Sequence, residues 1–75
     1  MKIGDLFKYR HTGMHKDVTL IILHDAVENK RYLFNIDYSV RVGDSHLLYA
    51  KHVGRASKKD IEKYTKISNT INKNS

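Results

Sequence analysis

Apolar side chains occupy every second position from Tyr32 to Val42, and most of the positions between them are polar. Only an extended strand, whose side chains alternate between two faces, places such a row on one side. A single strand from Arg31 to Val42 would span ~36 Å at ~3.3 Å per residue, which exceeds the width of a domain of this size. The pattern therefore predicts a β-rich protein in which this strand bends or splits near Asp37 to Ser39.

Three further segments have the composition of strands, and short polar turns separate them. Leu6 to Arg10 alternates around two aromatic residues, and Val18 to His24 is rich in β-branched residues and apolar on both faces. The latter composition is typical of a central strand. His46 to Val53 predicts the last strand, with turns before it at Asp25 to Lys30 and at Gly43 to Ser45.

The last third of the chain predicts an amphipathic helix over about residues 57–71. Ser57 stands three residues before Asp60, which is the spacing of a helix N-cap. On a helical wheel four apolar residues fall within ~120° of one another, a stripe suited to docking on a sheet. These are Ile61, Tyr64, Ile67 and Ile71. Lysines fill the opposite side, and residues 72–75 are polar enough to predict a frayed tail.

These elements predict one small domain over residues 1–71, with strands in about 3–53 followed by the helix. The fold class is mainly β with a C-terminal α-helix (α+β). Over residues 3–53 the order of strands and turns resembles the SH3-like small barrels in general architecture. That resemblance implies an antiparallel barrel of four to five strands, covered or flanked by the helix. The chain contains no cysteine, so disulfides and Cys-based zinc sites are excluded.

The positive charge of the chain is concentrated after Tyr49. Residues 1–49 carry seven Lys and Arg against six Asp and Glu, whereas residues 50–75 carry seven against two. Charge gathered in one element indicates a partner more strongly than the same charge spread evenly. The partner that this distribution predicts is nucleic acid or an acidic protein.

Two basic groups are expected to contact that partner. The first is the helix and the junction before it, with Arg55, Lys58, Lys59, Lys63 and Lys66. The second is the first loop, where Arg10 and Lys16 flank a stretch next to Tyr9, an aromatic ring suited to stacking on an unpaired base. Both groups have a plain alternative: the lysines form a solvated helix face, and Tyr9 is a core residue.

Enzymatic, metal and membrane functions find no support in the sequence. There is no G-x-S-x-G motif or cysteine nucleophile, so we expect a non-enzymatic protein without a cofactor. His11 and His15 are four residues apart, but Thr12-Gly13 predicts a loop between them and no third metal ligand follows at a recognisable spacing. The longest apolar stretch, Val18 to Leu23, is shorter than the ~20 residues of a membrane span, and a cytoplasmic location is expected.

The sequence thus predicts a small basic module that binds nucleic acid through the phosphate backbone. The alternative is a protein-interaction module, such as a small regulator or inhibitor, that docks on an acidic protein surface. Ten Lys against four Arg, with five Asn, are compatible with a phage-encoded protein. A homodimer through an edge strand, either Leu6 to Arg10 or Leu47 to Val53, also stays open.

Overall fold

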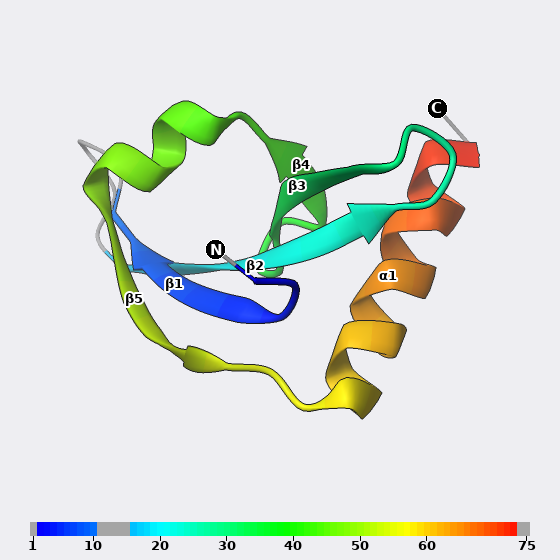
Figure 1. The fold of residues 1–75 in the computed structure, drawn as a ribbon. Coiled ribbons are helices and arrows are strands. Elements are labelled where there is room, and N and C mark those ends of the chain that lie inside the picture. Colours follow the sequence, from blue (N-terminus) through cyan, green and yellow to red (C-terminus); the bar gives the residue numbers. More distant parts are fainter. Residues whose placement is uncertain (1, 11–15, 74–75) are drawn as a thin grey trace.

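One antiparallel sheet and a C-terminal helix make up the computed structural model, which describes residues 2–10 and 16–73 (Figure 1). The elements in chain order are β1 (Asp5–Tyr9), β2 (Val18–Asp25), β3 (Lys30–Asn35), β4 (Val40–Val42), the 3₁₀ helix η1 (Asp44–Tyr49), β5 (Ala50–Arg55) and α1 (Lys58–Lys73). The five strands are ordered β4-β3-β2-β1-β5. The predicted α+β class is confirmed, and β2 is the central strand as expected.

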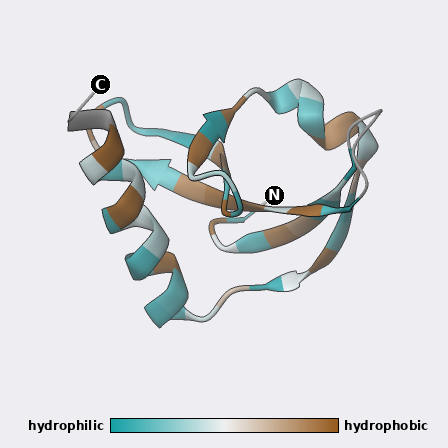
Figure 2. Ribbon diagram, turned by 180° about the vertical axis from the view of Figure 1, so that it is seen from behind, coloured by the Kyte–Doolittle hydropathy of each residue, from teal (hydrophilic) through white to brown (hydrophobic). Residues whose placement is uncertain are grey.

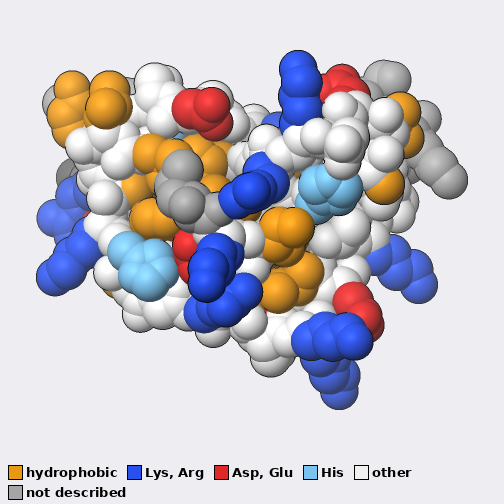
Figure 3. Space-filling view, in the orientation of Figure 1, with side chains coloured by type: hydrophobic (Ala, Val, Ile, Leu, Met, Phe, Trp, Pro, Cys, Tyr) orange, Lys and Arg blue, Asp and Glu red, His pale blue; other side chains and the backbone are white. Residues whose placement is uncertain are grey.

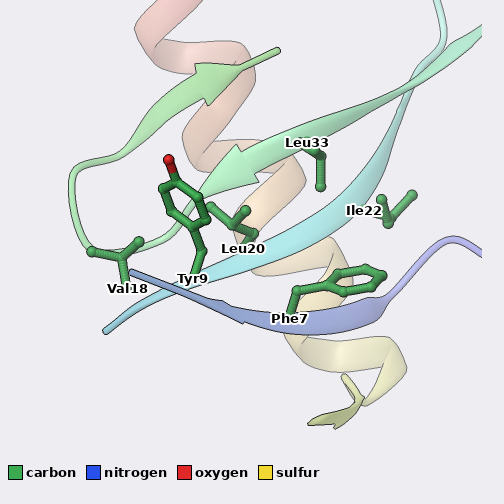
Figure 4. Close-up of a cluster of buried hydrophobic side chains, with 6 residues drawn as sticks. All are labelled: Phe7, Tyr9, Val18, Leu20, Ile22 and Leu33. Atoms are coloured by element: carbon green, nitrogen blue, oxygen red, sulfur yellow. The ribbon is translucent and has the colours of Figure 1, made fainter. Parts of the chain in front are cut away.

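The sheet buries apolar side chains on both faces because β2 is apolar at nearly every position. Its inner face carries a cluster of Phe7, Tyr9, Val18, Leu20, Ile22 and Leu33 (Figure 4). Its other face, called the helix face below, carries Ile21, Leu23 and Phe34 under α1. Hydrophobic residues accordingly run along β2 and recur at intervals along α1 (Figure 2).

Helix α1 docks on the helix face through the predicted stripe. Ile61, Tyr64 and Ile67 pack against the cluster there. The N-cap is confirmed, since the backbone N–H of Asp60 donates to Ser57 Oγ at 3.2 Å. The helix continues to Lys73, two residues beyond its expected end, so residues 72–73 of the predicted tail are helical. Residues 74–75 of that tail lie outside the described residues.

An N-terminal turn joins the start of α1 to the sheet. The backbone N–H of Gly4 donates to the carbonyl of Ile22 at 2.8 Å, and that of Ala56 donates to the carbonyl of Gly4 at 2.8 Å. Gly4 has a φ of +96°, and a Cβ built on it would lie 2.6 Å from Ile61 Cδ1. Glycine is therefore required here both by the backbone angle and by the closeness of the helix.

The strand expected from Arg31 to Val42 divides into the hairpin of β3 and β4, as the length argument predicted. The interpretation of its apolar row as one buried face is wrong, because Leu33 and Phe34 are both buried while Tyr38 is 58% exposed. The chain reverses over residues 36–39 and pairs Val40 with Asn35. The buried Asn35 side chain supports this turn by accepting a hydrogen bond from the Tyr38 N–H at 3.1 Å.

The strand expected over His46 to Val53 is also partly wrong, since its first half belongs to η1 and β5 begins at Ala50. The apolar pattern in this segment follows a period of three, because Leu47 and Ala50 both pack against the inner-face cluster. The backbone N–H of His46 donates to the Gly43 carbonyl at 3.2 Å and starts the 3₁₀ turn.

The sheet curls but does not close into the expected SH3-like barrel. The last strand, β5, returns to pair with β1, while β4 and β5 form the two edges of the sheet. No pairing joins these edges in the part of the chain that the structure describes. A strand of only three residues, β4, offers few backbone groups for closure.

Candidate nucleic-acid interface

The exposed side of α1 carries four of the predicted binding residues on one rigid element. Lys58, Lys59, Lys63 and Lys66 are all exposed, and they are called the lysine face below. Among the described residues none of the four makes a salt bridge with a carboxylate. Lys63 has one further contact, since its Nζ lies 5.5 Å from the centre of the Tyr64 ring. The lysine face therefore presents its charge to solvent.

The docking of α1 explains why these lysines point outward. The apolar stripe is held against the sheet, so residues on the opposite side of the wheel must face solvent. Glu62 lies among the lysines in the helix, and Asp60 lies in its first turn, so the local excess of positive charge is moderate. A shallow polar hollow of ≈ 370 Å³ lies beside Lys66 and is lined also by Glu62 and Asn69.

Arg55, the remaining residue of the first predicted group, ends β5 and lies opposite Asp5 in the register of the sheet. Its Nη2 lies 3.5 Å from the Ile3 carbonyl, which is a weak hydrogen bond. The pKa of Asp5 is lowered, chiefly by the backbone N–H of Lys2 and less by the charges of His52 and Arg55. Arg55 is therefore partly balanced by a carboxylate, unlike the lysine face.

The second predicted group lies at the two ends of the first loop, with Arg10 before it and Lys16 after it. Arg10 Nε lies 2.9 Å from Asp17 Oδ1, so its charge is shared in an exposed ion pair. Lys16 is exposed, while residues 11–15 between them, including His11 and His15, lie outside the described residues.

The expectation that Tyr9 stacks on a base is wrong. Tyr9 is 8% exposed and belongs to the inner-face cluster. Its ring centre lies 4.9 Å from that of His46, which takes the space a base would need. Tyr9 is therefore a core residue, and the candidate interface does not include a base stacked on its ring.

Strand pairing brings together two exposed lysines that the sequence did not relate to each other. Lys8 on β1 lies directly opposite Lys51 on β5. Both point to the helix face, because Lys8 is two residues from Leu6, which packs there. Lys8 Nζ also donates to Thr19 Oγ1 at 3.2 Å. Nothing in the local sequence relates positions so far apart, so only the register reveals this pair.

The inner face of the sheet holds a second hollow, of ≈ 280 Å³, with apolar walls. Ile22, Leu33 and Leu47 line it, and Arg31 and Asp44 stand beside them. Figure 3 shows hydrophobic side chains reaching the surface in the middle of one side of the molecule, with Lys and Arg around them.

The described residues contain no group of three or more His, Asp or Glu side chains placed to hold a metal ion. None of their helices combines the length and the apolar character needed to cross a membrane.

Comparison with known proteins gives this chain no family. No protein family, curated protein or solved structure matches it.

Proposed function

We propose that this protein is a small non-enzymatic module that binds nucleic acid through the phosphate backbone, using the lysine face of α1. The observation that carries the proposal is the set of four exposed lysines on one docked helix, none of which forms a salt bridge with a carboxylate of the described residues. Such lysines can neutralise phosphates and release the counterions condensed on them. A docked helix also holds them in place before binding, which lowers the entropy lost on association.

The length of the lysine face sets the expected number of contacts. Lys58 and Lys66 are eight residues apart, or ~12 Å along the helix axis at ~1.5 Å per residue. Successive phosphates of one DNA strand are spaced by ~3.4 Å along the duplex, so the row matches three or four of them. Lysine is a point charge, and we therefore expect binding with little sequence preference.

The alternative function is docking of the same lysine face on an acidic protein surface, as in a small regulator or inhibitor. The burial of Tyr9 favours this alternative, because it removes the aromatic ring expected to stack on a base. Arg55 is the one Arg in residues 50–75, and tryptophan is absent from the chain, which also limits base recognition. Both functions are compatible with a cytoplasmic protein and with a phage origin.

We also propose that the sheet is an incompletely closed member of the SH3-like class of small barrels. The supporting observation is that the last strand pairs with the first, which is the step that brings the ends of the sheet toward each other. This assignment of the fold carries no function by itself.

Fluorescence anisotropy with labelled single-stranded DNA, duplex DNA and RNA at several salt concentrations tests the nucleic-acid proposal. For duplex DNA we expect the logarithm of affinity to fall with the logarithm of salt concentration with a slope of about −3 to −4, since each phosphate contact contributes about −0.9. Replacing Lys63 and Lys66 with Gln should make this slope less steep by about 2. The matched control replaces two other exposed lysines, Lys2 and Lys30, with Gln and should leave the slope unchanged.

Two results would contradict the proposal. If none of the three nucleic acids binds at low salt, the protein does not act through phosphates. If the control variant loses as much affinity as the Lys63/Lys66 variant, net charge alone explains the binding and α1 is not the interface.

A further inference from the structure

The outer side of β5 is an edge of the sheet. β5 has six residues, and among the described residues it pairs with β1 alone. The opposite edge strand, β4, has three residues and is too short to hold a partner strand firmly. An edge strand exposes backbone N–H and C=O groups, and an extended peptide can pair with them as an additional strand. Of the two edges, β5 is therefore the one suited to strand addition.

The charge along β5 selects the chemistry of an incoming strand. Lys51, His52 and Arg55 are all exposed on it, and Lys8 lies beside Lys51 on the neighbouring strand. On the inner face Asp5 balances part of this charge, since its Oδ1 lies 3.6 Å from His52 Nε2. On the helix face the described residues place no carboxylate in a salt bridge with Lys8 or Lys51. An acidic side chain on that face of an added strand would lie next to Lys51, with Lys8 on the far side of Lys51.

The same charge argues against a second copy of this chain as the occupant. Two β5 strands paired with each other would place Lys51 and Arg55 of both copies along one short ladder. Like charges on facing strands destabilise the pairing, and lysines on an edge are a known obstacle to self-association. The positive charge along β5 thus both disfavours pairing with a second copy and attracts an acidic segment.

Exposed apolar side chains next to this edge can add hydrophobic contacts to the attraction between charges. Val53, at the irregular part of the β1–β5 register, is 48% exposed. Leu48 and Tyr49, which lead directly into β5, are each 78% exposed.

The register shift places Lys51 and Gly54 opposite Lys8 and Leu6, which share the helix face, so Val53, next to Gly54, turns toward the other face. An added strand that alternates acidic and apolar residues would therefore place its acidic residues beside Lys51 and its apolar residues beside Val53.

We propose that β5 accepts an extended acidic segment of a partner protein as a sixth strand of the sheet. Main-chain hydrogen bonds along the edge supply affinity, and the Lys8–Lys51 pair together with Val53 selects acidic and apolar side chains. This surface is separate from the lysine face of α1, so the two proposals can succeed or fail independently.

The test is an NMR titration of the isotope-labelled full chain with a synthetic peptide as long as β5, acetylated and amidated, that alternates Glu with Val. We expect amide shifts and slowed hydrogen exchange over Ala50–Arg55. The same peptide with Lys in place of Glu is the charge control and should not bind. Lys51→Glu should weaken binding at least about fivefold, because it replaces an attraction with a repulsion. Lys30→Glu, at an exposed lysine away from β5, is the matched variant and should bind as the wild type does.

Three outcomes would overturn the proposal. The first is equal binding of the Glu and Lys peptides, which would mean that charge does not select the partner. The second is that the shifts map to the lysines of α1 and not to β5. The third is concentration-dependent shifts of β5 without peptide, accompanied by a dimer in sedimentation, which would make a second copy the occupant.

Discussion

Replacing Gly4 with Ala should be among the most damaging single-methyl changes in this protein. The φ of +96° at Gly4 costs an L-residue roughly 1–2 kcal/mol. The new Cβ would also lie 2.6 Å from Ile61 Cδ1, and over-packing of this kind costs ~1–3 kcal/mol, the lower end applying if the side chain can rotate away. The smaller entropy of the unfolded chain returns ~0.4–1 kcal/mol. The net loss is therefore ~1–5 kcal/mol.

This loss is large for a chain of 75 residues, whose total stability is expected to be ~4–11 kcal/mol at ~0.05–0.15 kcal/mol per residue. Urea unfolding followed by far-UV circular dichroism measures it. With a slope of ~1 kcal/mol per molar urea, the midpoint should fall by ~1–5 M. Gly43→Ala is the matched control, because its φ is −75° and the nearest atom to a new Cβ is Ser45 Oγ at 3.9 Å. Its stability should change by at most ~0.5 kcal/mol.

A double-mutant cycle separates the two causes. Ile61→Val removes Cδ1 and by itself should cost ~0.5–1.5 kcal/mol. In the Gly4→Ala background the same change relieves the contact, so the double variant should be no less stable than Gly4→Ala alone. Two results would refute this explanation. One is that Gly4→Ala destabilises the protein no more than Gly43→Ala does. The other is that Ile61→Val destabilises the Gly4→Ala variant as much as it destabilises the wild type.

Two further predictions concern side-chain hydrogen bonds. Ser68→Ala should destabilise the fold by ~1–2 kcal/mol in urea unfolding, because Tyr32 Oη donates a hydrogen bond to the buried Ser68 Oγ at 2.9 Å. The control is Thr70→Ala, at an exposed position of the same helix. An effect of Ser68→Ala no larger than that of Thr70→Ala would contradict the prediction. The pKa of Asp25 is lowered, first by the hydrogen bond from the Glu28 N–H and next by the Arg41 guanidinium. The stability that the Asp25 carboxylate contributes to the fold is therefore present above the ordinary Asp pKa and is lost as pH falls through the lowered value. Asp25→Asn should therefore reduce the loss of stability between about pH 5 and pH 2, and an unchanged acid titration of stability would argue against this role.

Several features of the fold are encoded in short stretches of sequence. β2 was predicted as the central strand because its residues are apolar on both faces, and both faces are buried. Ser57 and the stripe of Ile61, Tyr64 and Ile67 predicted the helix, its N-cap and its docking side. These features depend on contacts between residues at most a few positions apart, or on a periodicity that lies within one element.

Other features depend on which distant segments pair, and local patterns do not contain that information. The length of the alternating row after Tyr32 predicts a bend or a split. Only the pairing of β4 with β3 shows that the row forms a hairpin. Tyr9 alternates like a surface strand residue, yet the curl of the sheet buries its ring. Lys8 and Lys51 become neighbours only through the β1–β5 register. Local sequence is therefore enough to predict β2, the helix with its N-cap and the outward-facing lysines of α1. The tertiary structure decided how the sheet curls, which edge stays open and which charges meet there, because these depend on pairing between residues far apart in the chain.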